Sequence, residues 1–272
     1  MNIEVIMSAY NNIEDLKLVL EGFQNQTDVN FSLCVADDGS TAELANLLTE
    51  FNHAAFSIRH IWHEDKGFRR AAILNKAIAS SNADYIIFTD SDCIPAINFI
   101  ADHRNFASLN HYTVGIRVYL KEKLSQNIRN RTLPITQLKN TCYLLLQSIH
   151  GNVSKPEQAI YFPDWSLPIV KKLKPNLTRF GSNLAMSRES LLKVNGFDED
   201  FEGWGYEDTD LLCRIEKIGL TPHGYLGRCR QYHLNHKTYP PSQNGRNLFL
   251  KKKEKNIVAC INGINKTSYA SH

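Results

Sequence analysis

Short apolar runs alternate with segments of helical periodicity along the first hundred residues. The strand-like runs are four, at 3–10, 31–36, 56–62 and 85–90. Between them, apolar residues recur at helical spacing, as Leu16, Val19, Leu20 and Phe23 do, and predict helices near 12–23, 42–51 and 68–80. This order predicts an α/β fold with a Rossmann-like, mostly parallel central sheet flanked by helices.

Each strand-like run is followed by polar residues. The four connecting segments are 8–11, 37–40, 65–70 and 90–92. Because parallel strands end at one edge of a sheet, and ligands bind at that edge in open α/β sheets, we expect these segments to form one site.

The run that starts at Tyr85 ends in Asp90-Ser91-Asp92. Two carboxylates at the end of a buried strand suit a hard divalent cation that keeps positions free for phosphate oxygens, so a diphosphate ligand is expected. The alternative is that Asp90 caps a helix beginning near Ala96 and that Asp92 is a solvated turn residue.

Two of the other segments carry groups suited to a nucleotide. Asp38 could accept a hydrogen bond from the imide N–H of a pyrimidine, and Gly39 lets the backbone turn closely beneath it, although Asp-Gly-Ser is also a common turn. Gly67 precedes Arg69 and Arg70 at a predicted helix start, where amide groups and a guanidinium could together neutralise a phosphate.

The middle of the chain carries weaker signals. It predicts helices at 96–109 and 135–149 and a strand at 113–120. The proline-rich stretch 150–176, with Tyr161 and Trp165, suits an acceptor wall and a packed surface loop equally well. Further strands are expected at 180–187 and 224–226, with a short helix at 188–194 between them.

A second cluster of acids follows glycines and a tryptophan. Trp204 lies between Gly203 and Gly205, and Glu207 and Asp208 start a predicted helix. The positive end of a helix keeps a carboxylate ionised, as a general base requires, whereas a plain helix cap would leave the glycines and the tryptophan without a purpose. Downstream, a neutral imidazole could complete a metal site with Asp92, and His233 and His236 compete for that role.

The amino-acid composition excludes several classes of protein. The chain has 272 residues, 43% apolar and 22% charged, and its net charge of +3 is too small to indicate nucleic acid as the partner. Six scattered cysteines without a Cys-x-x-Cys pair argue against structural zinc and a disulfide framework. No signal sequence or membrane-span-length run is visible, so a cytoplasmic protein is expected.

The motifs of the first half resemble those of inverting family-two glycosyltransferases with the GT-A fold. They are Tyr10-Asn11, Asp37-Asp38-Gly39-Ser40, Asp65-x-Gly67 and Asp90-Ser91-Asp92. Those of the second half resemble the galactosyltransferase C-terminal module shared by bacterial chondroitin-type polymerases and Golgi β-galactosyltransferases. They are Phe180-Gly181, Asn195-Gly196-Phe197, Gly203-Trp204-Gly205-Tyr206-Glu207-Asp208 and Gly227-Arg228-Cys229-Arg230.

The resemblance implies a role for each matched residue. The donor site would comprise Ala9, Tyr10, Gly67 and Ser91 together with Asp38 on uracil, Arg70 on the diphosphate and Asp90 on the ribose or on the metal through water. Asp92 and His233 would bind Mn²⁺ or Mg²⁺. Trp204 would bridge donor and acceptor, Gly181 would border the acceptor, and Asp208, with Glu207 beside it, would be the catalytic base.

The implied reaction moves a hexose or N-acetylhexosamine from a UDP-sugar to a hydroxyl of a glycan or lipid-linked acceptor. Residues 1–110 would bind the nucleotide-sugar, and 111–272 would complete the same domain with the acceptor-binding and catalytic half. A flexible flap is expected at 234–247. The basic helix expected at about 247–260, with Lys251, is a candidate contact with the inner membrane face.

One position departs from the pattern. Golgi enzymes have a methionine as a further metal ligand after the Arg-Cys-Arg run, whereas here Gln231 stands near that place and the spacing to His233 is one residue shorter, which leaves the identity of the metal open.

Two other classes of protein fit these residues less well. A sugar-phosphate nucleotidyltransferase would have a glycine-rich basic loop where Ser8-Ala9-Tyr10-Asn11 stands, and a carbohydrate-binding module would not need Asp90, Asp92 and Asp208 together.

Overall fold

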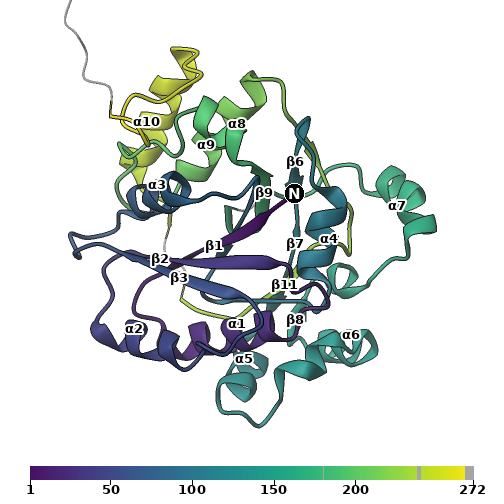
Figure 1. Ribbon diagram of the computed structural model, residues 1–272. Helices are drawn as coiled ribbons and strands as arrows, with labels where there is room; N and C mark the ends of the chain where they lie inside the picture. Colours follow the sequence, from purple (N-terminus) through teal and green to yellow (C-terminus); the bar gives the residue numbers. More distant parts are fainter. Residues whose placement is uncertain (180, 238–239, 267–272) are drawn as a thin grey trace, which may run out of the picture.

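The computed structural model describes residues 1–179, 181–237 and 240–266. Its main sheet has seven strands in the order β10-β6-β9-β4-β1-β2-β3 (Figure 1). The strands are β1 Ile3–Ala9, β2 Phe31–Asp37, β3 Ser57–Trp62, β4 Tyr85–Asp90, β6 His111–Val114, β9 Leu184–Ser187 and β10 Thr221–His223. Strands β1 to β4 are parallel, whereas β9 runs antiparallel to both β4 and β6. The predicted α/β fold with a mostly parallel central sheet is confirmed.

Helices cover both faces of this sheet (Figure 1). On one side lie α1 Ile13–Gln24, α2 Ala42–Thr49 and α4 Phe99–Phe106, and on the other lie α3 Arg70–Ser80, α8 Arg188–Lys193 and α9 Glu207–Lys217. Strand β1 serves both sides, because Val5 and Met7 pack into one hydrophobic cluster and Ile6 between them packs into the other. Burial on both faces is the reason why these strands are apolar runs without alternation.

A second, four-stranded sheet has the order β5-β11-β7-β8. Its strands are β5 Cys93–Pro95, β11 Arg230–His233, β7 Ile116–Leu120 and β8 Val153–Ser154. The remaining elements are α5 Glu122–Arg129, α6 Thr141–Ile149, α7 Leu167–Leu173 and α10 Gln243–Glu254, with 3₁₀ turns η1 Ile135–Lys139, η2 Pro156–Ala159, η3 Asp164–Ser166 and η4 Gly181–Asn183. No helix in the described ranges has the length and apolar character needed to cross a bilayer.

Three strand predictions were wrong in their bounds. The strand expected at 113–120 is divided between the two sheets at Gly115, where a Cβ would fall 2.0 Å from Asn183 Oδ1. The strand expected at 224–226 lies earlier, at β10, since Gly224 packs against the Val114 carbonyl. For the strand expected at 180–187, Phe180 lies outside the described residues, 181–183 form η4, and β9 begins at Leu184.

Two helices begin at a different residue from the one expected, because a capping side chain sets where each helix starts. Asn140 accepts a hydrogen bond from the Tyr143 amide at 3.0 Å and starts α6 there, which divides the helix expected at 135–149. Ser242 caps α10 through the Gly245 amide at 3.2 Å, so the basic helix occupies 243–254 rather than 247–260. The expected flap of 234–247 includes 238–239, outside the described residues, and its last part belongs to α10.

Asn183 connects the two sheets. Its buried side chain donates hydrogen bonds to the main-chain carbonyls of Ile116 at 3.0 Å and Cys229 at 2.8 Å. The main-chain carbonyl of Asn183 accepts a hydrogen bond from the Gly115 amide at 3.0 Å. The division at Gly115 therefore depends on a side chain from a distant part of the chain.

We expect Asn183→Ala to lower the free energy of unfolding by about 3 kcal/mol, because it removes three buried hydrogen bonds, two to main-chain carbonyls and one with His103. Urea unfolding followed by circular dichroism measures this. The matched control is Asn176→Ala, at an exposed asparagine, which should leave the midpoint unchanged. Equal midpoints for the two variants would contradict the connecting role of Asn183.

Candidate active site

The site begins where β1 and β4 end side by side. Ser8 pairs in register with Asp90, and the Ser8 hydroxyl donates to Asp90 Oδ1 at 2.8 Å. Arg70, the first residue of α3, reaches the same place, with its Nε 3.3 Å from Ser8 Oγ and its Nη2 3.3 Å from Asp90 Oδ1. Arg70 and Asp90, both predicted to bind the donor, thus meet at the carboxyl edge of the sheet.

Arg70 also contacts the acids of the second half. Its Nη1 lies 3.0 Å from Asp208 Oδ1 and 3.6 Å from Glu207 Oε1. Although burial disfavours its charged form, the charges of Asp208, Asp90 and Glu207 raise the pKa of Arg70 further above its usual value. One buried guanidinium therefore joins Asp90 and Asp208, which are 118 positions apart in the sequence.

Gly181 forms the wall behind Asp208. A Cβ at position 181 would fall 1.7 Å from Asp208 Oδ2, so only glycine leaves room for the carboxylate. The Gly181 and Asp208 predicted for the acceptor side and for catalysis are therefore in direct contact.

Glu207 and Asp208 differ in environment. Glu207 is buried, and burial together with the negative charge of Asp208 raises its pKa to about 7. Its Oε2 accepts from the Gly205 amide at 3.0 Å. The side chain of Asp208 is 28% exposed. Of the two predicted catalytic acids, Asp208 is the one that a bound molecule can reach.

Trp204 lies on the turn before α9, and 49% of its surface is exposed. Two other segments enclose the turn: the Gly203 amide donates to the Phe68 carbonyl at 3.4 Å, and the Ser242 amide donates to the Trp204 carbonyl at 3.0 Å. Gly205 has φ +106°, and a Cβ there would lie 2.8 Å from Pro241. The glycines around Trp204 therefore allow a tight turn between two neighbouring segments.

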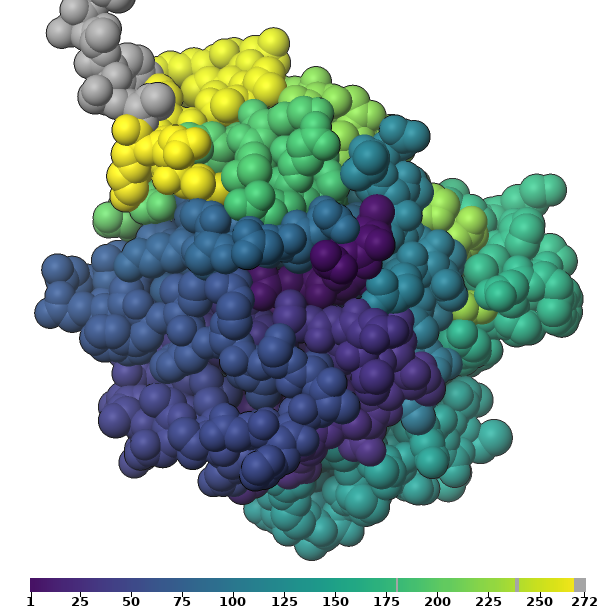
Figure 2. Space-filling view, in the orientation of Figure 1, coloured from purple at the N-terminus to yellow at the C-terminus, as the bar shows by residue number. Residues whose placement is uncertain are grey.

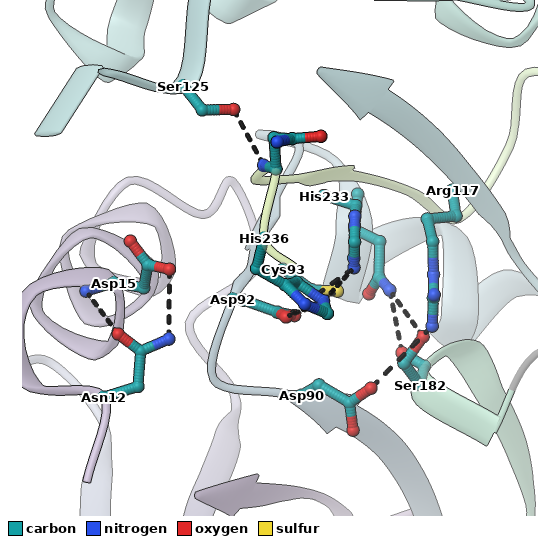
Figure 3. A network of polar contacts seen from close by, with 12 residues as sticks. Asn12, Asp15, Asp90, Asp92, Cys93, Arg117, Ser125, Ser182, His233 and His236 are labelled. Atoms are coloured by element: carbon teal, nitrogen blue, oxygen red, sulfur yellow. Dashed lines mark hydrogen bonds and ion pairs between the residues drawn. The ribbon is translucent and has the colours of Figure 1, made fainter. Parts of the chain in front are cut away.

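Asp92 forms a compact group with two histidines (Figure 3). Its Oδ2 lies 3.6 Å from His233 Nε2 and 3.1 Å from His236 Nε2, and the two imidazole nitrogens are 3.2 Å apart. Cys93 Sγ lies 3.2 Å from Asp92 Oδ1. The sequence left His233 and His236 as competitors, but the structure brings both to Asp92.

The two histidines have opposite pKa shifts. Burial lowers the pKa of His233 to about 4, whereas the hydrogen bond to Asp92 raises that of His236 to about 9. Burial of Asp92 favours its neutral form, but the His236 hydrogen bond and the charges of both histidines lower its pKa to about 2. One carboxylate with imidazole nitrogens is a donor set that can hold a divalent transition metal, and carboxylate oxygen is a ligand that suits both Mn²⁺ and Mg²⁺.

That Arg117 belongs to the site was not predicted from the sequence. It lies on β7, and its Nη2 is 3.7 Å from Asp90 Oδ2 (Figure 3). Asp90 therefore lies between two guanidiniums, those of Arg70 and Arg117, while Asp92 faces the imidazoles. The signal was the alternation in Ile116-Arg117-Val118-Tyr119-Leu120, which places Arg117 and Tyr119 on the same face of the strand.

Hydrogen bonds connect the segments that are predicted to bind the nucleobase of the donor. Asp38 donates its amide to the Ala9 carbonyl at 2.9 Å, and its carboxylate accepts from the Arg69 amide at 2.8 Å. Its other oxygen lies 2.6 Å from His63 Nε2, a contact that no local pattern signalled. Among the remaining donor candidates, Tyr10 Oη donates to Asp65 at 2.9 Å, the Gly67 amide donates to Asp65 at 3.0 Å, and the Ser91 amide donates to the Ser8 carbonyl at 3.1 Å.

The residues around Arg228 have a structural role. Arg228 Nη1 contacts the buried Asp102 at 3.0 Å, and the Cys229 amide donates to the same carboxylate at 3.0 Å. Gln231, which replaces the methionine of the Golgi enzymes, donates to the Ser182 carbonyl at 2.8 Å and accepts from Thr89 at 3.2 Å. Its amide thus links the two sheets.

Comparison with known protein families decides the class. The model of Glycosyl transferase family 2 matches residues 4–192, and a model described as the N-terminal domain of galactosyltransferase matches residues 170–237. The chain belongs to glycosyl transferase family 2. The predicted family and the prediction of a glycosyltransferase are confirmed, and the second match covers the part of the chain that carries Gly181, Trp204, Asp208 and His233.

Individual relatives are distant. The chain is 23% identical to chondroitin synthase of Escherichia coli over 234 residues, which is 80% of this chain and 32% of the synthase. The chain thus spans about a third of the length of that relative. Among solved structures, GalNAc-T7 with UDP, GalNAc and Mn²⁺ has a TM-score of 0.62 at 14% identity, covering 92% of this chain and 48% of the other. The mannosyltransferase PcManGT from Pyrobaculum calidifontis, in complex with GDP-Man and Mn²⁺, has a TM-score of 0.57 at 16% identity, covering 87% and 57%.

Binding of Mn²⁺ at Asp92, His233 and His236 should release one proton. His236 must lose its proton to become a ligand, whereas His233 and Asp92 are already deprotonated at neutral pH. We therefore expect the affinity to rise about tenfold for each unit by which the pH is raised below about 9.

Isothermal titration with Mn²⁺ at a series of pH values measures this slope. The control variant His236→Asn should show weaker binding and almost no pH dependence. A wild-type affinity that does not change with pH would contradict the participation of His236.

Proposed function

We propose that this glycosyltransferase is metal-dependent and inverting, and that it moves a hexose or N-acetylhexosamine from a UDP-sugar to a hydroxyl of a glycan or lipid-linked acceptor in the synthesis of a surface polysaccharide. The observation that carries the proposal is the contact of Arg70 with both Asp90 and Asp208. It supports one site to which the two halves of the chain contribute.

In this proposal, residues 1–110 bind the nucleotide-sugar and 111–272 complete the domain with the acceptor and catalytic groups. Asp38 accepts the imide N–H of uracil, and His63 and the Arg69 amide hold its carboxylate in place. The UDP and GalNAc named for GalNAc-T7 and the GDP-Man named for PcManGT support a nucleotide-sugar donor, and the choice of uracil rests on Asp38.

The charges of the site suit a diphosphate with a divalent cation. Asp90, Asp92, Glu207 and Asp208 contribute carboxyl groups, and Arg70 and Arg117 contribute guanidiniums. A Mn²⁺ or Mg²⁺ ion held by Asp92, His233 and His236 would act as a Lewis acid on the leaving diphosphate. Arg70 neutralises the charge that develops on the same leaving group, with Arg117 on the other side of Asp90.

Asp208 is the general base of the proposed reaction. Its carboxylate accepts the proton of the acceptor hydroxyl as that oxygen bonds to the anomeric carbon and the bond to the diphosphate breaks. Attack from the opposite face inverts the configuration. Trp204, which is exposed and lies four residues before Asp208 in the sequence, supplies a surface against which the two sugars pack. The buried Glu207 holds the turn that carries Trp204 by accepting a hydrogen bond from the Gly205 amide.

Asp208→Asn should retain UDP binding and lower turnover by a factor of about 10²–10⁴, the usual contribution of a general base. Rates of transfer from a panel of UDP-sugars, with the affinity for UDP measured in parallel, test this. Glu207→Gln is the matched variant, and its affinity for UDP should also be unchanged. Wild-type turnover in Asp208→Asn would remove this residue from the role of base.

Asp92→Ala should abolish the part of UDP binding that depends on Mn²⁺. Titration of UDP with and without Mn²⁺ gives a large difference for the wild-type protein and almost none for this variant. If manganese strengthened UDP binding equally in both proteins, the cation would have to bind elsewhere.

A further inference from the structure

Helix α7 and the turn before it expose a row of large apolar side chains. Trp165, Ile169 and Leu173 are 78%, 56% and 81% exposed, and their spacing of four residues places them on one side of the segment. The opposite side is already packed, because Leu167 and Val170 are buried. A helix that is apolar on its outer side as well needs a further apolar environment.

The segment is also basic. Residues 150–179 contain five Lys or Arg and two acidic residues, a net charge of +3, which equals the formal net charge of the whole chain. The basic residues are Lys155, Lys171, Lys172, Lys174 and Arg179. Within the segment, Lys174 pairs with Glu157 and Arg179 pairs with Glu216, whereas Lys155 and Lys172 are exposed. On α10, expected earlier to meet a membrane, Lys252 pairs with Asp198 and Asp200.

The segment projects from the molecule. Figure 1 shows α7 at the edge of the fold, away from the main sheet, and Figure 2 shows this part of the chain as a lobe at the right-hand edge. Lys171 anchors it by donating to the Gly224 carbonyl at 3.1 Å and lying 5.8 Å above the ring of Tyr225. A projecting, anchored helix can meet a flat surface without rearrangement of the sheets.

We propose that the α7 surface, defined by Trp165, Ile169, Leu173 and the lysines beside them, binds an anionic lipid bilayer. Apolar side chains with tryptophan enter the interface of the bilayer, and lysines pair with anionic headgroups. The proposal rests on the proposed function only in that a membrane surface is where a lipid-linked acceptor resides.

Two other occupants fit less well. A two-fold contact with a second copy would place one +3 segment against another, and a seven-residue helix is small beside the roughly 800 Å² that each partner buries in a stable interface. A glycan would stack on Trp165, but Ile169 and Leu173 continue the row without hydrogen-bonding groups.

Co-sedimentation of the full chain with vesicles tests the proposal. Vesicles of phosphatidylcholine mixed with phosphatidylglycerol should bind the wild-type protein, and those of phosphatidylcholine alone should bind it much less. The triple variant Trp165→Ser, Ile169→Ser, Leu173→Ser should lower the affinity for mixed vesicles by about tenfold or more. Lys172→Glu should lower it less, and more at low salt than at high salt.

The control is the double variant Lys251→Glu, Lys253→Glu on α10, which should bind vesicles as the wild type does. UDP binding, measured with and without Mn²⁺, should be the same in all these variants, so a failure of docking is distinguishable from a failure of the proposed donor site. Three results would each overturn the proposal: equal vesicle binding by the triple variant, loss of binding in the α10 control, and a dimer in light scattering that the triple variant dissociates while vesicles remain unbound.

Discussion

The structure depends on one buried cation. Arg70 starts α3 beneath the carboxyl ends of β1 and β4 and contacts acids from both halves of the chain. Without that charge, Asp90, Glu207 and Asp208 would approach one another across a poorly solvated space, and their repulsion would separate the two halves. The same guanidinium therefore holds these acids together and would face the diphosphate in the proposed reaction. For this residue, stability and function cannot be assigned to different contacts.

The small sheet supplies the opposite side of the site by simple alternation. On β11, Gln231 and His233 face the site, whereas Arg230 and Tyr232 face the other way. On β7, Arg117 occupies the corresponding position. Because successive side chains of a strand point to opposite faces, a shift of one residue in the pairing of β11 with β7 would exchange these sets. The register within the small sheet is thus part of the site, and Asn183, which donates to the carbonyls of Ile116 and Cys229, helps to hold it.

Much of the first half could be predicted because its signals are local. The runs of β1 to β4 and the acids that follow them occur within short windows, and so do the glycines around Trp204. The three-residue β5, the division at Gly115 and the position of β10 escaped prediction because partners far along the chain determine them. Arg117 and His63 escaped for the same reason: each becomes recognisable only beside the aspartate that it contacts. Asp92 was predicted to share a metal with either His233 or His236, and the sequence could not show that both imidazoles lie beside it.

The contact between Gly181 and Asp208 limits how this enzyme can be altered. The wall behind the carboxylate is main chain, so any added atom at position 181 must displace the aspartate. If Asp208 is the base, as proposed, attempts to broaden acceptor choice have no freedom at this point and must act on the exposed side, around Trp204. In the proposed reaction, a residue without a side chain would thereby set how far an incoming hydroxyl stands from the group that deprotonates it.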